Sequence, residues 1–165
     1  MATITLKGNP VHTSGNLPEK GQKAPDFSLV RSDLSELRLS ELKGKRIILN
    51  IFPSLDTDVC AASVRKFNEK AAGLNNTMVL AISKDLPFAM GRFCSTEGID
   101  RVITLSAFRN QFFGKEYGVE ITDGPFTGLL ARSVLVLDEQ GKVIHSQLVP
   151  EIAQEPDYEA ALSVL

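Results

Sequence analysis

Cysteine is scarce in this sequence, which holds only Cys60 and Cys94 among 165 residues. Small secreted domains that depend on disulfide bonds use many more, so a disulfide scaffold is excluded, and two cysteines fit an intracellular or a periplasmic protein. No apolar run approaches the ~18 residues of a membrane span, and the first residues lack the charged and apolar stretches of a signal peptide. The sequence therefore predicts a cytoplasmic protein without a membrane partner.

An excess of basic side chains is missing as well. Eighteen Lys and Arg residues face twenty Asp and Glu residues, which gives a formal net charge of −2. Binding to nucleic acid depends on clustered Lys and Arg, so we expect no nucleic-acid partner. The two cysteines and two histidines lack the spacing of metal ligands, and no glycine-rich phosphate loop occurs, so we expect no metal and no cofactor.

The composition that remains is typical of an ordinary globular protein. Hydrophobic residues make up 43% of the chain and charged residues 23%, without a biased tract. A chain of 165 residues buries a core unaided, and no interdomain linker interrupts it, which predicts one domain over residues 1–165. Residues 1–15 alternate weakly around Lys7 and Gly8, and we expect an added N-terminal β-hairpin there.

Hydrophobic periodicity predicts strands that alternate with helices. Apolar runs of strand length occur at 24–30, 34–39, 46–52, 77–83, 102–105, 133–137 and 142–149. Steps of three and four predict an amphipathic helix over 59–74, with the stripe Cys60, Val64, Phe67, Ala71 and Leu74. Further helices are predicted from Asp85 and Pro87 to about Cys94, over 107–117 with Ser106 as its cap, and over 156–165. This order predicts an α/β fold with a central mixed sheet flanked by helices.

Cys60 lies in the first turn of the predicted helix that follows the buried strand 46–52. Unpaired backbone N–H groups and the helix dipole favour negative charge there, so this position stabilises a thiolate, the reactive form of cysteine. The alternative is a small core residue, because Cys60 also begins the apolar stripe.

Two residues of the preceding loop add to the reactive interpretation. Pro53, Thr57 and Cys60 stand at the spacing P-x-x-x-T-x-x-C. Proline fixes the loop and can shield the sulfur from water, and the threonine hydroxyl can donate and accept a hydrogen bond. A peroxide bound beside the sulfur needs such a partner.

With these residues the chain resembles the peroxiredoxins, and in particular their bacterial thiol peroxidase subfamily. The resemblance is strongest at 50–54 (NIFPS), 56–57 (DT) and 59–67 (VCAASVRKF). It continues through 8–10 (GNP), 24–27 (APDF), 92–94 (RFC) and 155–162 (EPDYEAAL), and so spans essentially the whole chain.

The resemblance implies a thioredoxin-like fold and an antioxidant peroxidase that reduces hydrogen peroxide and organic hydroperoxides. It implies that Cys60 is the peroxidatic cysteine, that Cys94 resolves its sulfenic acid as an intramolecular disulfide, and that thioredoxin reduces this disulfide. Pro53 and Thr57 correspond to the family motif, and Arg132 matches a distant arginine that holds the thiolate and the peroxide. The resemblance further suggests a homodimer. Without the resemblance, the alternative interpretation of Arg132 is a surface charge at a strand end, and that of Cys94 is a buried helix residue.

The positions of the two cysteines predict a conformational change. A disulfide requires Cα atoms within about 7 Å, whereas Cys60 opens one predicted helix and Cys94 closes another. We expect both helical turns to unwind locally. Asp58 opposes the negative charge on Cys60, although aspartate is favoured at a helix start, where its carboxylate can accept backbone N–H bonds.

Four phenylalanines supply apolar surface for a hydroperoxide pocket or for the core: Phe88, Phe93, Phe112 and Phe113. Adjacent side chains on a helix point about 100° apart, so one of Phe112 and Phe113 is free for a subunit interface.

Three functions are alternatives to a peroxidase: a phosphatase, a cysteine hydrolase and a redox-responsive binding module. A phosphatase loop needs five residues between its cysteine and arginine, but Cys60 and Arg65 have four between them and no glycines. A cysteine hydrolase would need His145 or His12, which lie in strand patterns without an oxyanion motif. A redox-responsive binding module stays open, because stoichiometric oxidation without turnover would also use two cysteines.

Overall fold

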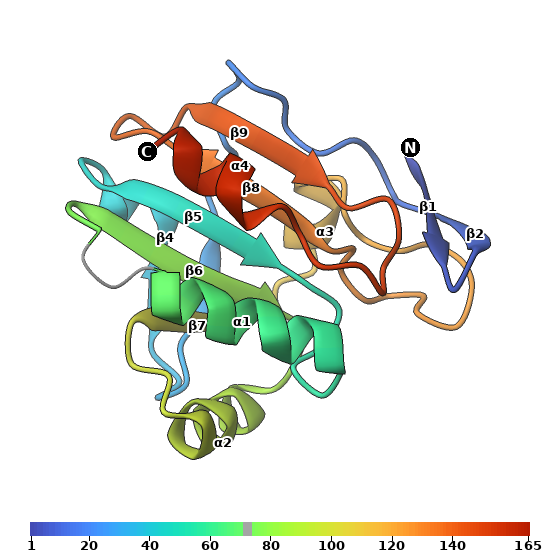
Figure 1. Cartoon of the computed structure of the whole chain (residues 1–165), viewed down its shortest axis with the longest axis horizontal. Helices are drawn as coiled ribbons and strands as arrows, with labels where there is room; N and C mark the ends of the chain where they lie inside the picture. The colour runs from blue at the N-terminus through green and yellow to red at the C-terminus, as the bar shows by residue number, and fades with distance from the viewer. Residues whose placement is uncertain (71–73) are drawn as a thin grey trace.

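A computed structural model describes residues 1–70 and 74–165, with a mixed seven-stranded sheet at the centre of the molecule (Figure 1). The strand order is β4-β3-β7-β6-β5-β8-β9, in which β5, β6 and β7 are parallel and the other neighbours pair antiparallel. The strands are β3 (Ser28–Val30), β4 (Glu36–Arg38), β5 (Arg46–Ile51), β6 (Thr77–Ser83), β7 (Val102–Ser106), β8 (Ser133–Leu137) and β9 (Val143–Leu148). A separate hairpin consists of β1 (Thr3–Leu6) and β2 (Asn9–His12). The predicted α/β fold with an N-terminal hairpin is confirmed.

Successive residues of a strand point to opposite faces of the sheet, and in the central strands apolar side chains are buried on both faces. Ile48 and Val79 point to one face, and Ile47, Leu49 and Leu80 to the other. The first face is covered by α1 (Asp58–Lys70), α2 (Pro87–Glu97) and α4 (Tyr158–Ser163), and the second by η1 (Leu39–Leu42), α3 (Phe113–Glu116) and the hairpin. In Figure 1, α1 and α4 lie in front of the sheet and α3 lies behind it.

The helix predicted over 59–74 corresponds to α1, which begins at Asp58 and therefore has Cys60 in its first turn. Its predicted end is wrong, because Leu74 is not helical, and Ala71 of the predicted stripe lies outside the described residues. The early start matters for function, since it places Cys60 among the N–H groups that have no partner within the helix.

The predicted helix start is confirmed at Pro87 and wrong at Asp85. Pro87 opens α2, where its missing N–H costs nothing, but Leu86 holds the capping position and no side chain caps the helix. The helix also runs past Cys94 to Glu97, and Gly98 ends it with a positive φ of 66° and an N–H bond to the carbonyl of Cys94.

The helix predicted over 107–117 is wrong for residues 107–112. Ser106 does not cap a helix there, because its hydroxyl donates to the carbonyl of Asp85 and accepts the N–H of Phe108 in a tight turn. The helix starts later because the carboxamide oxygen of Asn110 accepts the N–H groups of Phe112 and Phe113. Local hydrogen bonds of Ser and Asn compete with helix formation in this way.

The strand predicted over 24–30 is shortened at its start to β3. The N–H of Ala24 bonds to Gly141 outside the paired part of the strand, and Pro25 has no N–H to give to a neighbouring strand. The hairpin of β8 and β9 is confirmed, and the helix predicted over 156–165 is present but shorter, as α4. Asp157 caps α4 by accepting the N–H of Ala160.

Candidate active site

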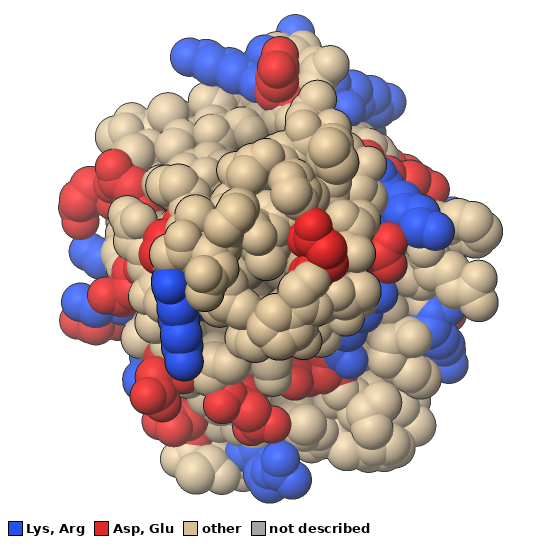
Figure 2. Space-filling model, turned by 90° about the vertical axis from the view of Figure 1, so that its right-hand side faces the viewer, with Lys and Arg blue, Asp and Glu red and all other residues tan. Residues whose placement is uncertain are grey.

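Cys60 lies where β5 passes through a short loop into α1, at the right-hand end of the sheet in Figure 1. Its side chain has 0% exposure and packs among apolar residues of the α1 face, including Phe52 and Val64. Figure 2 views this end of the molecule, where uncharged side chains cover most of the centre and charged ones gather mainly toward the edges. The sulfur is therefore shielded from water in the described conformation.

Arg132 is the charged partner of this buried sulfur. Its Nη2 donates to Cys60 Sγ at 3.2 Å, and the residue is only 1% exposed. The sheet explains the approach across 72 residues, because Ser133 of β8 pairs with Ile51 at the end of β5, from which the chain leads to α1. Among the described residues, the Cys60 sulfur is thus the one side-chain hydrogen-bond partner of this buried guanidinium.

One nitrogen of the Arg132 guanidinium has no hydrogen-bond partner among the described residues. Its Nε donates to the carbonyl of Ile152 at 2.9 Å, while Nη1 is buried and has no hydrogen-bond partner among the described residues. An unsatisfied buried donor is costly, and such groups are concentrated at functional sites. Nη1 is therefore a buried nitrogen without a partner among the described residues, on the same guanidinium that contacts the sulfur.

Thr57 and Pro53 lie in the loop between β5 and α1, as predicted. Thr57 is half-buried, and its hydroxyl donates to the carbonyl of Ser54 at 3.0 Å; no hydrogen bond joins it to Cys60 Sγ. Its proton is thus used within the loop, and its oxygen remains free as an acceptor. Pro53 is buried, which agrees with a shielding role.

Asp85 fixes this loop from the end of β6. Its carboxylate accepts the Ser54 hydroxyl at 2.7 Å, the Leu55 N–H at 2.8 Å and the Ser83 hydroxyl at 2.6 Å. Because Asp85 lies two residues before the first residue of α2, one side chain connects the loop before Cys60 with the start of the helix that carries Cys94. The sequence analysis assigned Asp85 to a helix start and missed this role, although a carboxylate two residues after a buried strand is a visible signal.

Asn50 and Ser63 hold the backbone of Cys60. The Ser63 hydroxyl donates to the Cys60 carbonyl at 2.7 Å, and the Asn50 amide donates to the Ser63 oxygen at 3.1 Å. Both side chains are fully buried. The only sequence signal for this pair is a polar residue within each of two apolar patterns.

Cys94 lies in the last turn of α2, half-buried, and packs against the same apolar cluster that contains Cys60. Both thiols are free. Burial raises the pKa of the Cys94 thiol above its usual range, and a hydrogen bond with Thr104 only partly opposes this shift. Cys94 therefore stays protonated at neutral pH.

The residues behind the rejected functions lie elsewhere. Arg65, the arginine of the phosphatase alternative, forms an ion pair with Glu97 at 3.5 Å. His12 pairs with Asp123 at 2.6 Å, and His145 lies in β9 opposite Val136. None of these three residues forms a hydrogen bond with Cys60.

Asp58 is exposed, whereas the sulfur of Cys60 is fully buried. Its carboxylate accepts no backbone N–H bond within the described part of the chain, so the predicted capping role is not seen. Water screens an exposed charge, which leaves Asp58 little influence on the buried sulfur.

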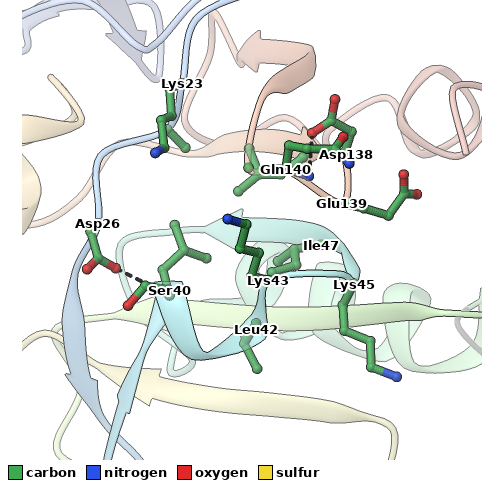
Figure 3. Close-up of a pocket in the computed structure, with 14 residues that line it drawn as sticks. Lys23, Asp26, Ser40, Leu42, Lys43, Lys45, Ile47, Asp138, Glu139 and Gln140 are labelled. Atoms are coloured by element: carbon green, nitrogen blue, oxygen red, sulfur yellow. Dashed lines mark hydrogen bonds between the residues drawn. The ribbon is translucent and has the colours of Figure 1, made fainter.

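A cavity of about 260 Å³ lies away from this site, between η1 and the turn that joins β8 to β9 (Figure 3). Lys23 and Lys43 point toward its opening, while Asp26 accepts the N–H of Ser40. None of the predicted site residues lines it. Across residues 1–70 and 74–165, no cluster of three His, Cys, Asp or Glu side chains could hold a metal, and no helix is long and apolar enough to cross a membrane.

Comparisons with known proteins agree with this geometry. A family model described as Redoxin matches residues 19–162. The thiol peroxidase of Corynebacterium glutamicum is 56% identical over 165 residues, which cover 100% of this chain and 99% of that protein. The structure of a peroxiredoxin-like protein from Aquifex aeolicus superimposes with a TM-score of 0.93 at 42% identity, over 99% of this chain and 96% of that one. A thiol peroxidase from Chromobacterium violaceum shares the fold, with a TM-score of 0.88 at 22% identity over 98% and 94% of the two chains.

Proposed function

Because the chain belongs to the redoxin family and is a thiol-dependent peroxidase of the peroxiredoxin type, we propose that Cys60 is the residue that attacks the peroxide. The single observation that carries this assignment is the 3.2 Å contact between Arg132 Nη2 and Cys60 Sγ inside a buried site. A buried structural cysteine has no need of a buried cation, whereas a nucleophilic thiolate does.

The first chemical step uses the groups around Cys60. The thiolate attacks the terminal oxygen of a hydroperoxide, the new S–O bond forms, and the O–O bond breaks with its electron pair on the leaving oxygen. Arg132 Nη1, which has no partner among the described residues, donates to the oxygen that gains charge, and Thr57 Oγ1 accepts a hydrogen bond from the hydroxyl group of the incoming hydroperoxide. Cys60 becomes a sulfenic acid, and the leaving oxygen takes a proton to give water or an alcohol.

Cys94 completes the cycle in our proposal. Its sulfur attacks the sulfenic acid, a disulfide forms and water leaves; a thioredoxin dithiol then reduces the disulfide and is itself oxidised. Cys60 is fully buried in the first turn of α1, and Cys94 lies in the last turn of α2, so we propose that both turns unwind to meet. We also propose a cytoplasmic location, where thioredoxin systems keep thiols reduced.

A thiol count tests the cycle. One equivalent of hydrogen peroxide is expected to convert the two free thiols to none, to link the peptides of Cys60 and Cys94, and to raise amide exchange at the start of α1 and the end of α2. Reduced thioredoxin should restore both thiols. Identical amide exchange in the two redox states would contradict local unwinding, and retention of the Cys94 thiol would remove it as the resolving residue.

We further propose that the molecule forms a homodimer through an exposed apolar patch, here called the 86–112 patch. Its members are the exposed side chains of Leu86, Phe88, Phe108 and Phe112. Phe88 and Phe112 are 68% and 66% exposed, which is unusual for phenylalanine in a monomer. The hydrogen bond from Ser106 to the carbonyl of Asp85 joins the two segments that carry these side chains. Phe113, in contrast, is buried against Phe27, so the interface role falls to Phe112.

Charge in the 86–112 patch should separate the subunits. Phe112→Glu, combined with Phe88→Glu, is expected to convert a dimer of about 36 kDa, twice the 18.0 kDa chain, into a monomer in light scattering. Val164→Glu, at another exposed apolar side chain, serves as the control and should leave the mass unchanged. A monomeric wild type at micromolar concentration would contradict the proposed dimer.

A further inference from the structure

We infer that the N-terminal hairpin positions Arg132 at the proposed active site. The hairpin binds the carboxylate of Glu151, this carboxylate fixes the carbonyl of Ile152, and that carbonyl orients Arg132 toward Cys60. Glu151 is thus a positioning residue. The inference rests on the proposed role of Arg132 in peroxide reduction.

The orientation of the Arg132 guanidinium depends on few contacts. Apart from the sulfur, its hydrogen-bond partner among the described residues is the Ile152 carbonyl, 2.9 Å from Nε. No carboxylate forms an ion pair with this guanidinium in the described part of the chain. A shift of the Ile152 carbonyl would therefore turn Nη1 and Nη2 away from the reacting atoms.

Ile152 lies in the segment between β9 and α4, which has no regular secondary structure. The hairpin holds this segment by its backbone: Thr5 N–H donates to the Pro150 carbonyl at 2.8 Å, and Ile152 N–H donates to the Thr5 carbonyl at 2.8 Å. The same segment is tied to the arginine itself, because Val149 N–H donates to the Arg132 carbonyl. The hairpin therefore contacts the residues on both sides of Glu151.

The carboxylate of Glu151 joins the hairpin to the residue that follows Ile152. Its Oε1 accepts the Thr5 hydroxyl at 3.0 Å and the Gly8 N–H at 2.9 Å, and its Oε2 accepts the Ala153 N–H at 2.8 Å. These N–H bonds, first that of Ala153 and then that of Gly8, lower the pKa of Glu151 to about 2. The carboxylate is therefore fully charged at neutral pH, where the reaction takes place.

A hairpin that only stabilises the fold would form the same contacts with Glu151. A second residue that binds the hairpin but has no connection to Arg132 is therefore needed as a control. Asp123 provides it: its Oδ1 accepts the His12 N–H at 2.7 Å, and its Oδ2 bonds to the His12 ring at 2.6 Å. Both acids hold the hairpin from outside, but Asp123 has no hydrogen bond to Ile152 or its neighbours. The two therefore differ in their connection to Arg132.

The test compares Glu151→Ala with Asp123→Ala in the full-length protein. Since a displacement of about 1 Å can cost about 100-fold, we expect Glu151→Ala to slow the reaction of Cys60 with hydrogen peroxide about 10-fold and to lower its thiolate absorbance at 240 nm. The chain has no tryptophan to report the reaction, so it is followed by rapid quenching, thiol alkylation and mass spectrometry. Glu151→Gln keeps an oxygen acceptor for Gly8 and should lose less.

Asp123→Ala is expected to lower the melting temperature without changing either readout at Cys60. Equal melting shifts in the two alanine variants, with an unchanged Cys60 reaction in both, would overturn the inference. Should Glu151→Ala fail to fold, Thr5→Val removes one bond to the same carboxylate and carries the same expectation. An Arg132→Lys variant with normal peroxide reactivity would instead overturn the proposed role of Arg132, which separates that failure from this one.

Discussion

Replacing Cys60 by serine is expected to abolish peroxide consumption, while Cys94→Ser should still consume one equivalent and then stop. A serine hydroxyl does not ionise at neutral pH, and loss of a covalent nucleophile costs about 10⁶-fold in a well-studied hydrolase. Cys94→Ser leaves Cys60, Arg132 and Thr57 in place, so sulfenic acid formation continues, but no disulfide forms for thioredoxin to reduce. The measurement is thioredoxin-coupled turnover together with the first-equivalent burst.

This pair of variants also separates the enzyme from a redox sensor. A peroxidase turns over many equivalents with thioredoxin and loses this turnover in both variants, whereas a sensor is oxidised once and shows little turnover even as wild type. Both substitutions are nearly isosteric, and equal melting temperatures would serve as the control for folding. Residual catalytic turnover in Cys60→Ser would assign the nucleophile to another residue.

The sheet could be predicted from the sequence because its central strands are buried on both faces. Runs such as 46–52 and 77–83 are therefore mostly apolar, and they match β5 and β6 closely. The helix predicted over 107–117 failed because its apolar spacing was real while Ser106 and Asn110 bonded to other backbone groups. Patterning reports burial well but does not report such local competition.

The site could be predicted only where its residues are close in sequence. Pro53, Thr57 and Cys60 share one loop and one helix start, so their spacing carries the signal. Arg132 reaches the sulfur through the pairing of β8 with β5, and no local pattern identifies it; only the resemblance to the peroxiredoxins did. Asp85 lies 31 residues from its partner Ser54, and its contact depends on the alignment of two strand ends.

The buried charge of Arg132 links reactivity to folding. A guanidinium that is 1% exposed is costly to desolvate, and its ordinary compensation would be a carboxylate. Here its partners are a backbone carbonyl and the Cys60 sulfur, which reacts as a thiolate in the mechanism that we propose. Oxidation to the sulfenic acid removes that negative charge. On this proposal, the folded conformation loses a favourable contact at the step in which α1 would unwind.

Arg132→Met is expected to have the second large effect: it should lower the rate of peroxide reduction strongly and change the stability of the fold little. Removal of a preorganised donor to a charged transition state costs about 10² to 10³ in rate, and here thiolate stabilisation is lost as well, so we expect a fall of about 10³-fold in the peroxide rate constant. Stability should change little. Replacing a buried ion pair by apolar side chains often stabilises a fold by about 1 to 4 kcal/mol, and removal of the lone Arg132 charge acts in the same direction. The orphaned Ile152 carbonyl opposes this gain with a cost of about 1 to 3 kcal/mol.

Arg132→Lys provides the matched variant, because it keeps the charge but not the geometry. One ammonium cannot reach the Ile152 carbonyl, the Cys60 sulfur and a peroxide oxygen from the three directions that the guanidinium spans. We therefore expect its rate constant to lie between those of wild type and Arg132→Met, with more Cys60 thiolate at neutral pH than in the methionine variant. Rapid-quench rates and absorbance at 240 nm measure the two quantities separately. If both variants kept the wild-type rate, the contact at Cys60 would be structural and the free Nη1 would have no part in the reaction.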